Sequence, residues 1–339
     1  MHTDDFDYQL PTERIAQTPI EPRHSARLMV MRRDRAELEH TTFWQVGEFL
    51  KPGDVLVINQ TQVIPARIFA RKPSGGKVEL LLLRRQDACT WEALVGGKRL
   101  VAGVRLALEN GQTVAVEAVL EGSRRLLRFS EAVEPYLEMN GQMPLPPYIH
   151  TPLANPGRYQ TVYAAQPGSA AAPTAGLHFT PELMQKLEAQ GIRFARLTLH
   201  VGLDTFAPVK EEDPAQHVIH TEWCELTQPA ADVINQARRG GGRVVAVGTT
   251  SVRTLETAAR AARPEETVGV FSGPTGLFIL PGHEFQAVDA MITNFHLPRS
   301  SLIMLVSAFS GRERILAAYR EAIRLQYRFY SFGDAMLIL

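Results

Sequence analysis

The chain has 339 residues, and its 36 Lys and Arg residues balance 36 Asp and Glu residues, so the formal net charge is zero. Hydrophobic residues make up 45% and charged residues 21%, which is typical of a globular chain of about two domains. Two cysteines are too few for a disulfide framework, and zero net charge argues against a uniformly cationic nucleic-acid coat. The N-terminus resembles no secretory signal, and the most apolar run, residues 302–309, is far shorter than a membrane helix. We therefore expect a cytoplasmic protein that is neither secreted nor embedded in a membrane.

The first 130 residues are predicted to form strands of two kinds. One strand is expected at residues 27–31, and the turn at 51–54 precedes a buried β-branched strand at 55–58. From about residue 68 the pattern changes to short strands, at 77–83, 91–95, 105–108, 113–116 and 126–129. Between two of them, Asn110-Gly111 supplies the positive φ angles of a tight hairpin. This stretch predicts a small antiparallel β module.

The rest of the chain alternates helices with strands. The proline-rich segment 143–149 is a natural linker, and Thr180, Pro181 and Gly191 mark the two ends of a helix. The other predicted elements are strands at 195–201 and 244–247 and helices at about 229–239, 250–262 and 312–325. The alternation predicts a larger α/β domain, residues 1–67 and 150–339, with a smaller all-β domain, residues 68–149, inserted in it.

A loop of small residues at 168–180 is the first candidate site. Small residues such as Gly176 let the backbone approach a ligand, and Thr174 and His178 add polar groups beside the start of a helix. The alternative is a connection that only caps that helix.

A second candidate site is the strand that carries His200 and ends at Gly202. In α/β sheets, ligands bind beyond the carboxyl ends of strands, although a lone strand histidine is usually a hydrogen-bonded core residue. The nearby His217, His220 and Glu222 have a spacing similar to that of metal ligands, but a further recognisable ligand is missing. We therefore expect no metal and interpret these three residues as part of a polar loop or strand edge.

Two further polar turns complete the set. Asn294, Phe295 and His296 stand in a turn that ends at a proline, where an aromatic ring could stack on a purine-like base. The other is a strand-to-helix turn that contains Thr249, Thr250 and Arg253. The hydroxyl and guanidinium groups of these residues could bind a carboxylate or phosphate. A solvated turn and ordinary helix capping are the respective alternatives. The chain has no G-x-G-x-x-G after a strand, no Walker A sequence and no G-x-S-x-G, which disfavours dehydrogenases, P-loop NTPases and serine hydrolases.

Taken together, these segments closely resemble one family, the S-adenosylmethionine:tRNA ribosyltransferase-isomerases of queuosine biosynthesis. The similarity runs nearly end to end, and its most specific blocks are residues 171–180 and 293–298. The other matching segments are Phe6-Asp7-Tyr8, Ile15-Ala16-Gln17, Pro52-Gly53-Asp54, Val63-Ile64-Pro65-Ala66-Arg67, Leu145-Pro146-Pro147-Tyr148-Ile149, Tyr159-Gln160-Thr161-Val162-Tyr163-Ala164, Leu199-His200-Val201-Gly202 and 327–336.

The resemblance implies a fold, a reaction and a partner. It implies an α/β domain with an inserted antiparallel β-barrel, which agrees with the strand pattern. It also implies that the protein is a monomer. It also implies that S-adenosylmethionine is the ribosyl donor. The ribosyl group is transferred and isomerised onto 7-aminomethyl-7-deazaguanine at the wobble position of tRNA. Epoxyqueuosine then remains in the RNA, and adenine and methionine leave.

This chemistry assigns hypothetical roles to the candidate residues. The sulfonium acidifies the adjacent ribose C–H, so a base is needed, for which we expect His178 or His200. A carboxylate would come from Glu222 or Asp289. We expect a base ring to be held by Asn294, Phe295 and His296, and the amino-acid tail by Thr249, Thr250 and Arg253. The loop with Thr174 and Gly176 is expected to contact the substrate.

Some residues depart from the family pattern. The family's Asn-Asp-Thr-Arg is replaced by Asn-Gln-Thr-Gln, with Gln60 and Gln62, so a fixed bidentate donor is lost. Gly202 is followed by Leu203 and Asp204, and an arginine is replaced by His150. Two alternatives stay open: a catalytically inactive RNA-binding module of the same fold, and a family member with a different acceptor.

Basic residues are scattered along a chain whose charges balance. They occur as Arg84-Arg85, Lys98-Arg99 and Arg124-Arg125 with Arg128, and also near residues 32–35 and 312–328. Phosphate binding needs a local basic surface and not a basic chain. Because several of these residues fall in the β insertion, we predict that this module helps to hold the RNA.

Overall fold

A computed structural model describes residues 1–202 and 208–339. The chain forms two compact units. The first comprises residues 1–61, 147–166 and 173–339, and the second residues 62–146 and 167–172. The second unit is therefore made mainly by one inserted segment, and the predicted fold class is confirmed. The boundaries expected from the sequence, after residues 67 and 149, stay a prediction.

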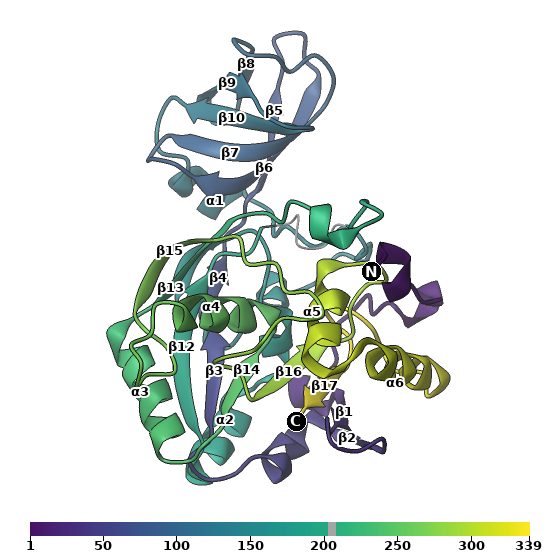
Figure 1. The fold of residues 1–339 in the computed structure, drawn as a ribbon. Helices are drawn as coiled ribbons and strands as arrows, with labels where there is room; N and C mark the ends of the chain where they lie inside the picture. The colour runs from purple at the N-terminus through teal and green to yellow at the C-terminus, as the bar shows by residue number, and fades with distance from the viewer. Residues whose placement is uncertain (203–207) are drawn as a thin grey trace. The chain divides into compact units, whose positions relative to one another are not determined.

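The larger unit is built on a nine-stranded mixed sheet (Figure 1). Its four central strands, β12, β3, β14 and β16, run parallel, and the outer strands include antiparallel pairs. In spatial order the strands are β15 (Phe271–Thr275), β13 (Glu222–Leu226), β12 (Arg193–Leu199), β3 (Val55–Asn59), β14 (Val244–Val247), β16 (Ala290–Asn294), β17 (Ala335–Ile338), β1 (Arg27–Met31) and β2 (Leu38–Thr42). The central parallel strands are buried on both faces, as their apolar runs predict.

Alternate residues of each central strand face two different cores. Val55 and Val57 of β3 pack under one group of helices, and Leu56 and Ile58 pack on the opposite face. The first face is covered by α3 (Gln228–Arg239), α4 (Thr249–Ala259), α5 (Ser301–Ser310) and α6 (Arg312–Arg324). The second is covered by α2 (Pro181–Ala189) and by the 3₁₀ turns η4 (Phe43–Phe49) and η6 (Thr174–His178).

The smaller unit is a closed barrel of six antiparallel strands in the order β10-β7-β6-β5-β8-β9. Apolar residues that alternate along the strands, such as Val78, Leu80 and Leu82, fill its interior. The strands are β5 (Arg67–Arg71), β6 (Lys77–Arg85), β7 (Thr90–Gly96), β8 (Arg105–Ala107), β9 (Thr113–Val119) and β10 (Arg124–Phe129). The short helix α1 (Glu134–Asn140) and the two-stranded sheet of β4 (Thr61–Val63) and β11 (Gln166–Ser169) complete the ordered elements near the insertion.

Most predicted elements are confirmed, but helices α1 and α5 and strands β2, β13, β15, β16 and β17 were not predicted. Thr180 caps α2 by accepting a hydrogen bond from the Leu183 N–H, and Gly111 has the expected positive φ of 90° in the β8–β9 hairpin. Helix α5 was not predicted because its apolar run has almost no polar face, which removes the 3.6-residue signal. Among the described residues, no helix is both long and apolar enough to cross a membrane.

Candidate active site

Polar residues gather where the parallel strands of the sheet end. Strand β3 ends at Asn59, β12 leads into His200, β14 into Gly248 and β16 ends at Asn294. Because these four strands are parallel, their carboxyl ends lie along one edge of the sheet. This is the edge at which α/β sheets bind ligands.

Asn59 connects three elements at this edge. Its Nδ2 donates to the Leu199 carbonyl oxygen at 2.9 Å and to Thr250 Oγ1 at 3.3 Å. Its Oδ1 accepts from the backbone N–H groups of Leu199 and Thr61, each at 3.1 Å. The side chain has no exposed surface, so this network fixes β3 against β12 and the start of α4. Asn59 was not among the predicted site residues, although a polar residue that directly follows a buried apolar strand was a usable signal.

Arg253 and Glu222 form a buried ion pair beside this network. A guanidinium Nη1 of Arg253 donates to Glu222 Oε2, and its Nε donates to the Leu277 carbonyl oxygen at 3.0 Å. The other carboxylate oxygen, Oε1, accepts from the Gly202 N–H at 2.9 Å. Both side chains are at least nine-tenths buried and already paired, so Arg253 supplies no free charge for the methionine carboxylate.

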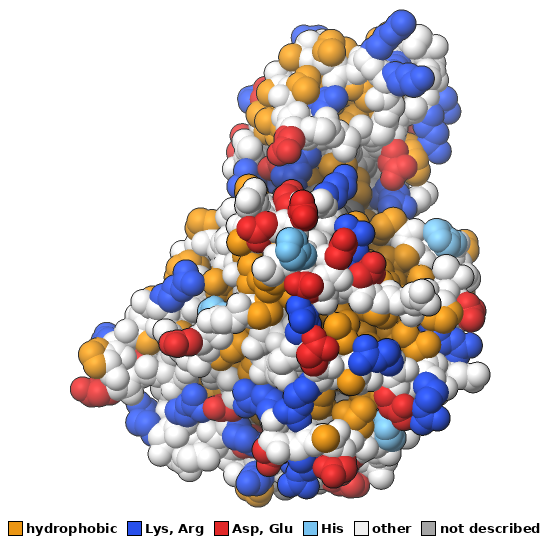
Figure 2. Space-filling view, turned by 45° about the vertical axis from the view of Figure 1, so that its right-hand side comes forward, with side chains coloured by type: hydrophobic (Ala, Val, Ile, Leu, Met, Phe, Trp, Pro, Cys, Tyr) orange, Lys and Arg blue, Asp and Glu red, His pale blue; other side chains and the backbone are white. Residues whose placement is uncertain are grey.

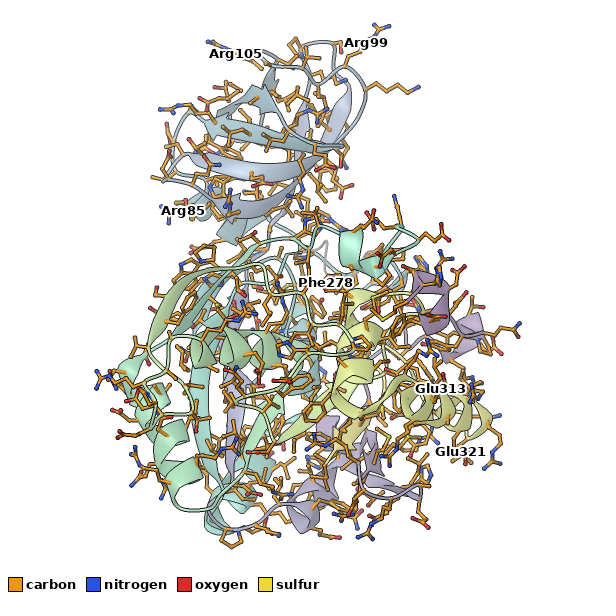
Figure 3. The ribbon with its side chains drawn as sticks, in the orientation of Figure 1. Arg85, Arg99, Arg105, Phe278, Glu313 and Glu321 are labelled. Carbon is orange, nitrogen blue, oxygen red and sulfur yellow. The ribbon has the colours of Figure 1, made fainter. Side chains whose placement is uncertain are left out.

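A small pocket opens beside the ion pair. It brings together the predicted residues Glu222, Thr249, Thr250 and Arg253. Its other walls come from the 217–220 loop, the 277–279 segment and the first turns of α5, with Phe278 labelled in Figure 3. Thr249 and Thr250 lie in the first turn of α4, where backbone N–H groups favour an anion.

His200 is half-buried at the end of β12. Its Nδ1 is hydrogen-bonded to Thr61 Oγ1 at 2.8 Å, and its ring is stacked on the partly exposed indole of Trp223, with centroids 5.4 Å apart. Burial lowers the pKa of His200, so the ring is neutral at pH 7. Its Nε2 forms no hydrogen bond to any described residue, which leaves a basic nitrogen for a ligand.

His178 lies deeper and is already engaged. Its Nε2 is 3.3 Å from Asn294 Nδ2, and Asn294 Nδ2 also donates to the Tyr330 carbonyl oxygen at 3.0 Å. Burial, assisted by nearby positive charges, lowers the pKa of His178 to about 4. Asn294 is 3% exposed, and its Oδ1 has no hydrogen-bond partner among the described residues. That oxygen is left to accept a hydrogen bond from a ligand.

The 3₁₀ turn η6 carries Thr174, Gly176 and His178 to the same edge. A Cβ at Gly176 would overlap the hydroxyl of Tyr163, so only glycine fits there. Ala175 lies against Gly248, whose positive φ of 88° opens the β14–α4 turn. The predicted loop is therefore a packed turn beside Thr249 and Thr250, and not a free connection.

Two residues predicted to hold a base ring, Phe295 and His296, do not fit that role. Phe295 has no exposed surface and packs among Tyr319, Tyr327 and Phe329, so no base can stack on it. His296 is buried beside it, with Nε2 bonded to Thr293 Oγ1 at 2.8 Å, and burial lowers its pKa to about 3. The sequence could not distinguish an aromatic residue in an exposed turn from one in the core.

Asp289 lies at the wrong edge of the sheet. It directly precedes β16, whereas Asn294 ends that strand. Its carboxylate accepts from the Val244 N–H at 2.8 Å and pairs with Arg238. These contacts stabilise the starts of β14 and β16 and place Asp289 outside the candidate site.

The departures from the family pattern are only partly covered by the structure. Gln60 Nε2 donates to Thr198 Oγ1 at 3.4 Å, one residue from the Asn59 network, and His150 is exposed. Leu203 and Asp204 lie outside the described residues. Within the described ranges, no three His, Cys, Asp or Glu side chains gather as metal ligands would.

Fold and site together define an α/β protein with an inserted β-barrel and a polar site at the carboxyl edge of its parallel strands. The sequence matches the family model described as queuosine biosynthesis protein over residues 3–338. The chain therefore belongs to this family, and the resemblance predicted from the motifs is confirmed.

Curated relatives and a solved structure agree with this assignment. The chain is 55% identical over 345 residues to the S-adenosylmethionine:tRNA ribosyltransferase-isomerase of Moorella thermoacetica. It is 54% identical over 344 residues to the protein of that name from Symbiobacterium thermophilum, and both alignments cover all of each chain. The crystal structure of S-adenosylmethionine tRNA ribosyltransferase from Thermotoga maritima matches with a TM-score of 0.57 and 40% identity. That match covers 99% of this chain and all of that one.

Proposed function

We propose that this chain is an enzyme that transfers and isomerises the ribosyl group of S-adenosylmethionine onto 7-aminomethyl-7-deazaguanine in tRNA. The product is epoxyqueuosine-tRNA, and adenine and methionine are released. The observation that carries this proposal is full-length similarity to relatives that bear the name of this activity, at up to 55% identity. The proposed setting is the cytoplasm, and the proposed active form is a monomer.

His200 is the proposed base. The sulfonium of the donor acidifies the neighbouring ribose C–H, and a neutral imidazole can remove that proton. The Thr61 hydroxyl holds Nδ1 at 2.8 Å, which leaves Nε2 to accept the proton. His178 fits this task less well because its Nε2 already faces Asn294 and burial lowers its pKa to about 4.

Asn294 is the proposed contact for the leaving base. Its buried Oδ1 lacks a partner among the described residues and suits the exocyclic amino group of adenine. A hydrogen bond there would orient the base while the glycosidic bond breaks. Thr174, Gly176 and His178 lie on η6, whose His178 is hydrogen-bonded to Asn294, and they would support this contact.

Thr249 and Thr250 are the proposed contacts for the carboxylate of the methionine tail. They stand in the first turn of an 11-residue helix, where N–H groups and hydroxyls can bind an anion. Arg253 and Glu222 are positioning residues in this scheme, because they bond to each other and to the backbone around the pocket.

The test is release of adenine from S-adenosylmethionine in the presence of tRNA that carries the aminomethyl-deazaguanine. We expect His200→Ala to slow adenine release by about 10²–10⁴-fold, the usual contribution of a positioned base. His178→Ala should slow it less, and His40→Ala on the distant edge strand β2 should leave it unchanged. Near-normal turnover of His200→Ala would remove it as the base.

The same assay separates the alternatives. Wild-type protein that binds tRNA without releasing adenine would be an inactive RNA-binding module. Adenine release with only another acceptor would show a different substrate in the same site.

A further inference from the structure

Six basic residues gather at one end of the barrel. We call this set the cationic end: Arg71, Lys72, Lys77, Lys98, Arg99 and Arg105. Strand pairing places Arg71 opposite Lys77 on one side and opposite Ala107 on the other. The Lys72 ammonium donates to the Lys98 carbonyl oxygen, which joins the β5–β6 hairpin to the loop after β7. In Figure 3, Arg99 and Arg105 project from this end of the barrel, and Arg85 lies at the other.

The charges of the cationic end are exposed and uncompensated. Five of the six residues are exposed and Lys72 is half-buried. Among the described residues, none of the six forms an ion pair, and the Lys77 ammonium instead lies 3.6 Å from the centre of the Phe69 ring. The adjacent β9–β10 turn contributes one carboxylate, Glu121. Figure 2 shows Lys and Arg side chains along one border of the barrel.

Most other basic residues of the barrel pair with carboxylates, whereas Arg125 donates to backbone carbonyl oxygens. Arg84 and Arg124 share Glu92, at 3.3 and 2.9 Å. Arg85 pairs with Glu134 at 3.0 Å, and Arg128 pairs with Glu117 at 3.6 Å. The two sets of basic residues cannot be distinguished in the sequence. Only the ion pairs in the structure show that the cationic end has positive charge available to bind a partner.

We propose that the cationic end binds the phosphate backbone of the tRNA substrate. This inference rests on the proposed function and narrows the RNA-binding surface to one end of the inserted unit. Exposed Lys and Arg without carboxylate partners release counterions when they meet phosphates, which gives affinity that depends on salt. S-adenosylmethionine carries a single carboxylate, so six cations spread over two hairpins and a loop suit a polyanion.

The test compares two triple variants of the full-length protein. The first variant removes half of the charges of the cationic end by combining Lys98→Gln, Arg99→Gln and Arg105→Gln. The matched control, Arg84→Gln, Arg85→Gln and Arg128→Gln, removes the same charge from the paired set. Binding of tRNA is measured at several salt concentrations, together with KM and kcat for both substrates.

We expect the first triple to weaken tRNA binding by at least about tenfold near 0.15 M salt and to lower the salt slope by about 2–3. The kcat and the KM for S-adenosylmethionine should not change. The control triple should bind tRNA nearly as the wild type does. A second triple, Arg71→Gln, Lys72→Gln and Lys77→Gln, should act like the first.

Three results would overturn the inference. They are an unchanged salt slope in the first triple, equal losses in both sets, and a rise confined to the KM for S-adenosylmethionine. Failure of the proposed function would give a different result, because the wild-type protein would then release no adenine. The direct measurement of tRNA binding would still test the cationic end in that case.

Discussion

The edge of the sheet and the end of the barrel use ionisable groups in opposite ways. At the sheet edge, Arg253, Glu222 and His178 are at least nine-tenths buried and bonded to other protein groups. At the cationic end of the barrel, Arg99 and Arg105 are exposed, and no carboxylate pairs with them among the described residues. The bonded, buried groups of the first region therefore fix the positions of side chains around the candidate site. The free charges of the second region can attract a polyanion.

The same difference predicts where substitutions will harm the protein. A buried charge that loses its partner is strongly destabilising, whereas a surface ion pair contributes about 0–1 kcal/mol. Substitutions at the sheet edge should therefore change stability, and substitutions on the barrel should change binding.

The largest effect should follow from Glu222→Ala. This change leaves the Arg253 guanidinium buried without its carboxylate, and we expect the free energy of unfolding to fall by about 3–5 kcal/mol. Urea denaturation measures it. Glu117→Ala, which breaks the surface pair with Arg128, is the barrel control and should lower the same quantity by less than about 1 kcal/mol. An equal fall in the free energy of unfolding in the two variants would contradict the difference between the sheet edge and the barrel.

Acid should weaken the sheet unit before the barrel. Burial lowers the pKa of His178 to about 4, whereas an unfolded histidine titrates near 6.5, so the unfolded state binds more protons between these values. Stability is thus full above about pH 6.5 and falls as the pH drops to about 4, by about 3 kcal/mol for this residue.

Residues 62–146 contain no histidine, which makes the barrel an internal control. Amide hydrogen exchange at pH 7 and 4.5 should show loss of protection in the sheet unit and smaller changes in the barrel. Greater loss in the barrel would contradict this account.

Gly176→Ala should have a smaller effect that is centred on the site. The added methyl group collides with the Tyr163 hydroxyl, and overpacking of this kind costs about 1–3 kcal/mol. Adenine release should also slow because η6 shifts. Gly76→Ala in the barrel hairpin, where the nearest neighbouring atom is 3.8 Å from the new methyl group, is the matched control and should change neither quantity measurably.

The sequence predicted the elements with a local signal. The caps of α2, the Asn-Gly hairpin and the apolar strands β3 and β14 follow from short-range preferences that any tertiary context preserves. Helix α5 was not predicted, because a helix that is buried on nearly all sides has no amphipathic periodicity in its sequence.

The candidate site was predictable in part. His178, His200, Glu222, Thr249, Thr250, Arg253 and Asn294 do lie along the carboxyl edge, because parallel strands bring their ends together. The sequence could not show that Arg253 is already paired, that Phe295 is in the core, or that Asp289 lies at the opposite edge. Those facts depend on neighbours distant along the chain.

By itself, the sequence determined the fold class, the family and the balance of charge. Motifs and local patterns carry that information because each depends on residues close together in the chain. Only the tertiary structure decided which of the balanced charges remain free. Arg85 and Arg99 look alike in the sequence, but Glu134 neutralises the first and no described carboxylate pairs with the second. Ion pairing is a property of spatial proximity, so a net charge of zero can still leave one surface positive.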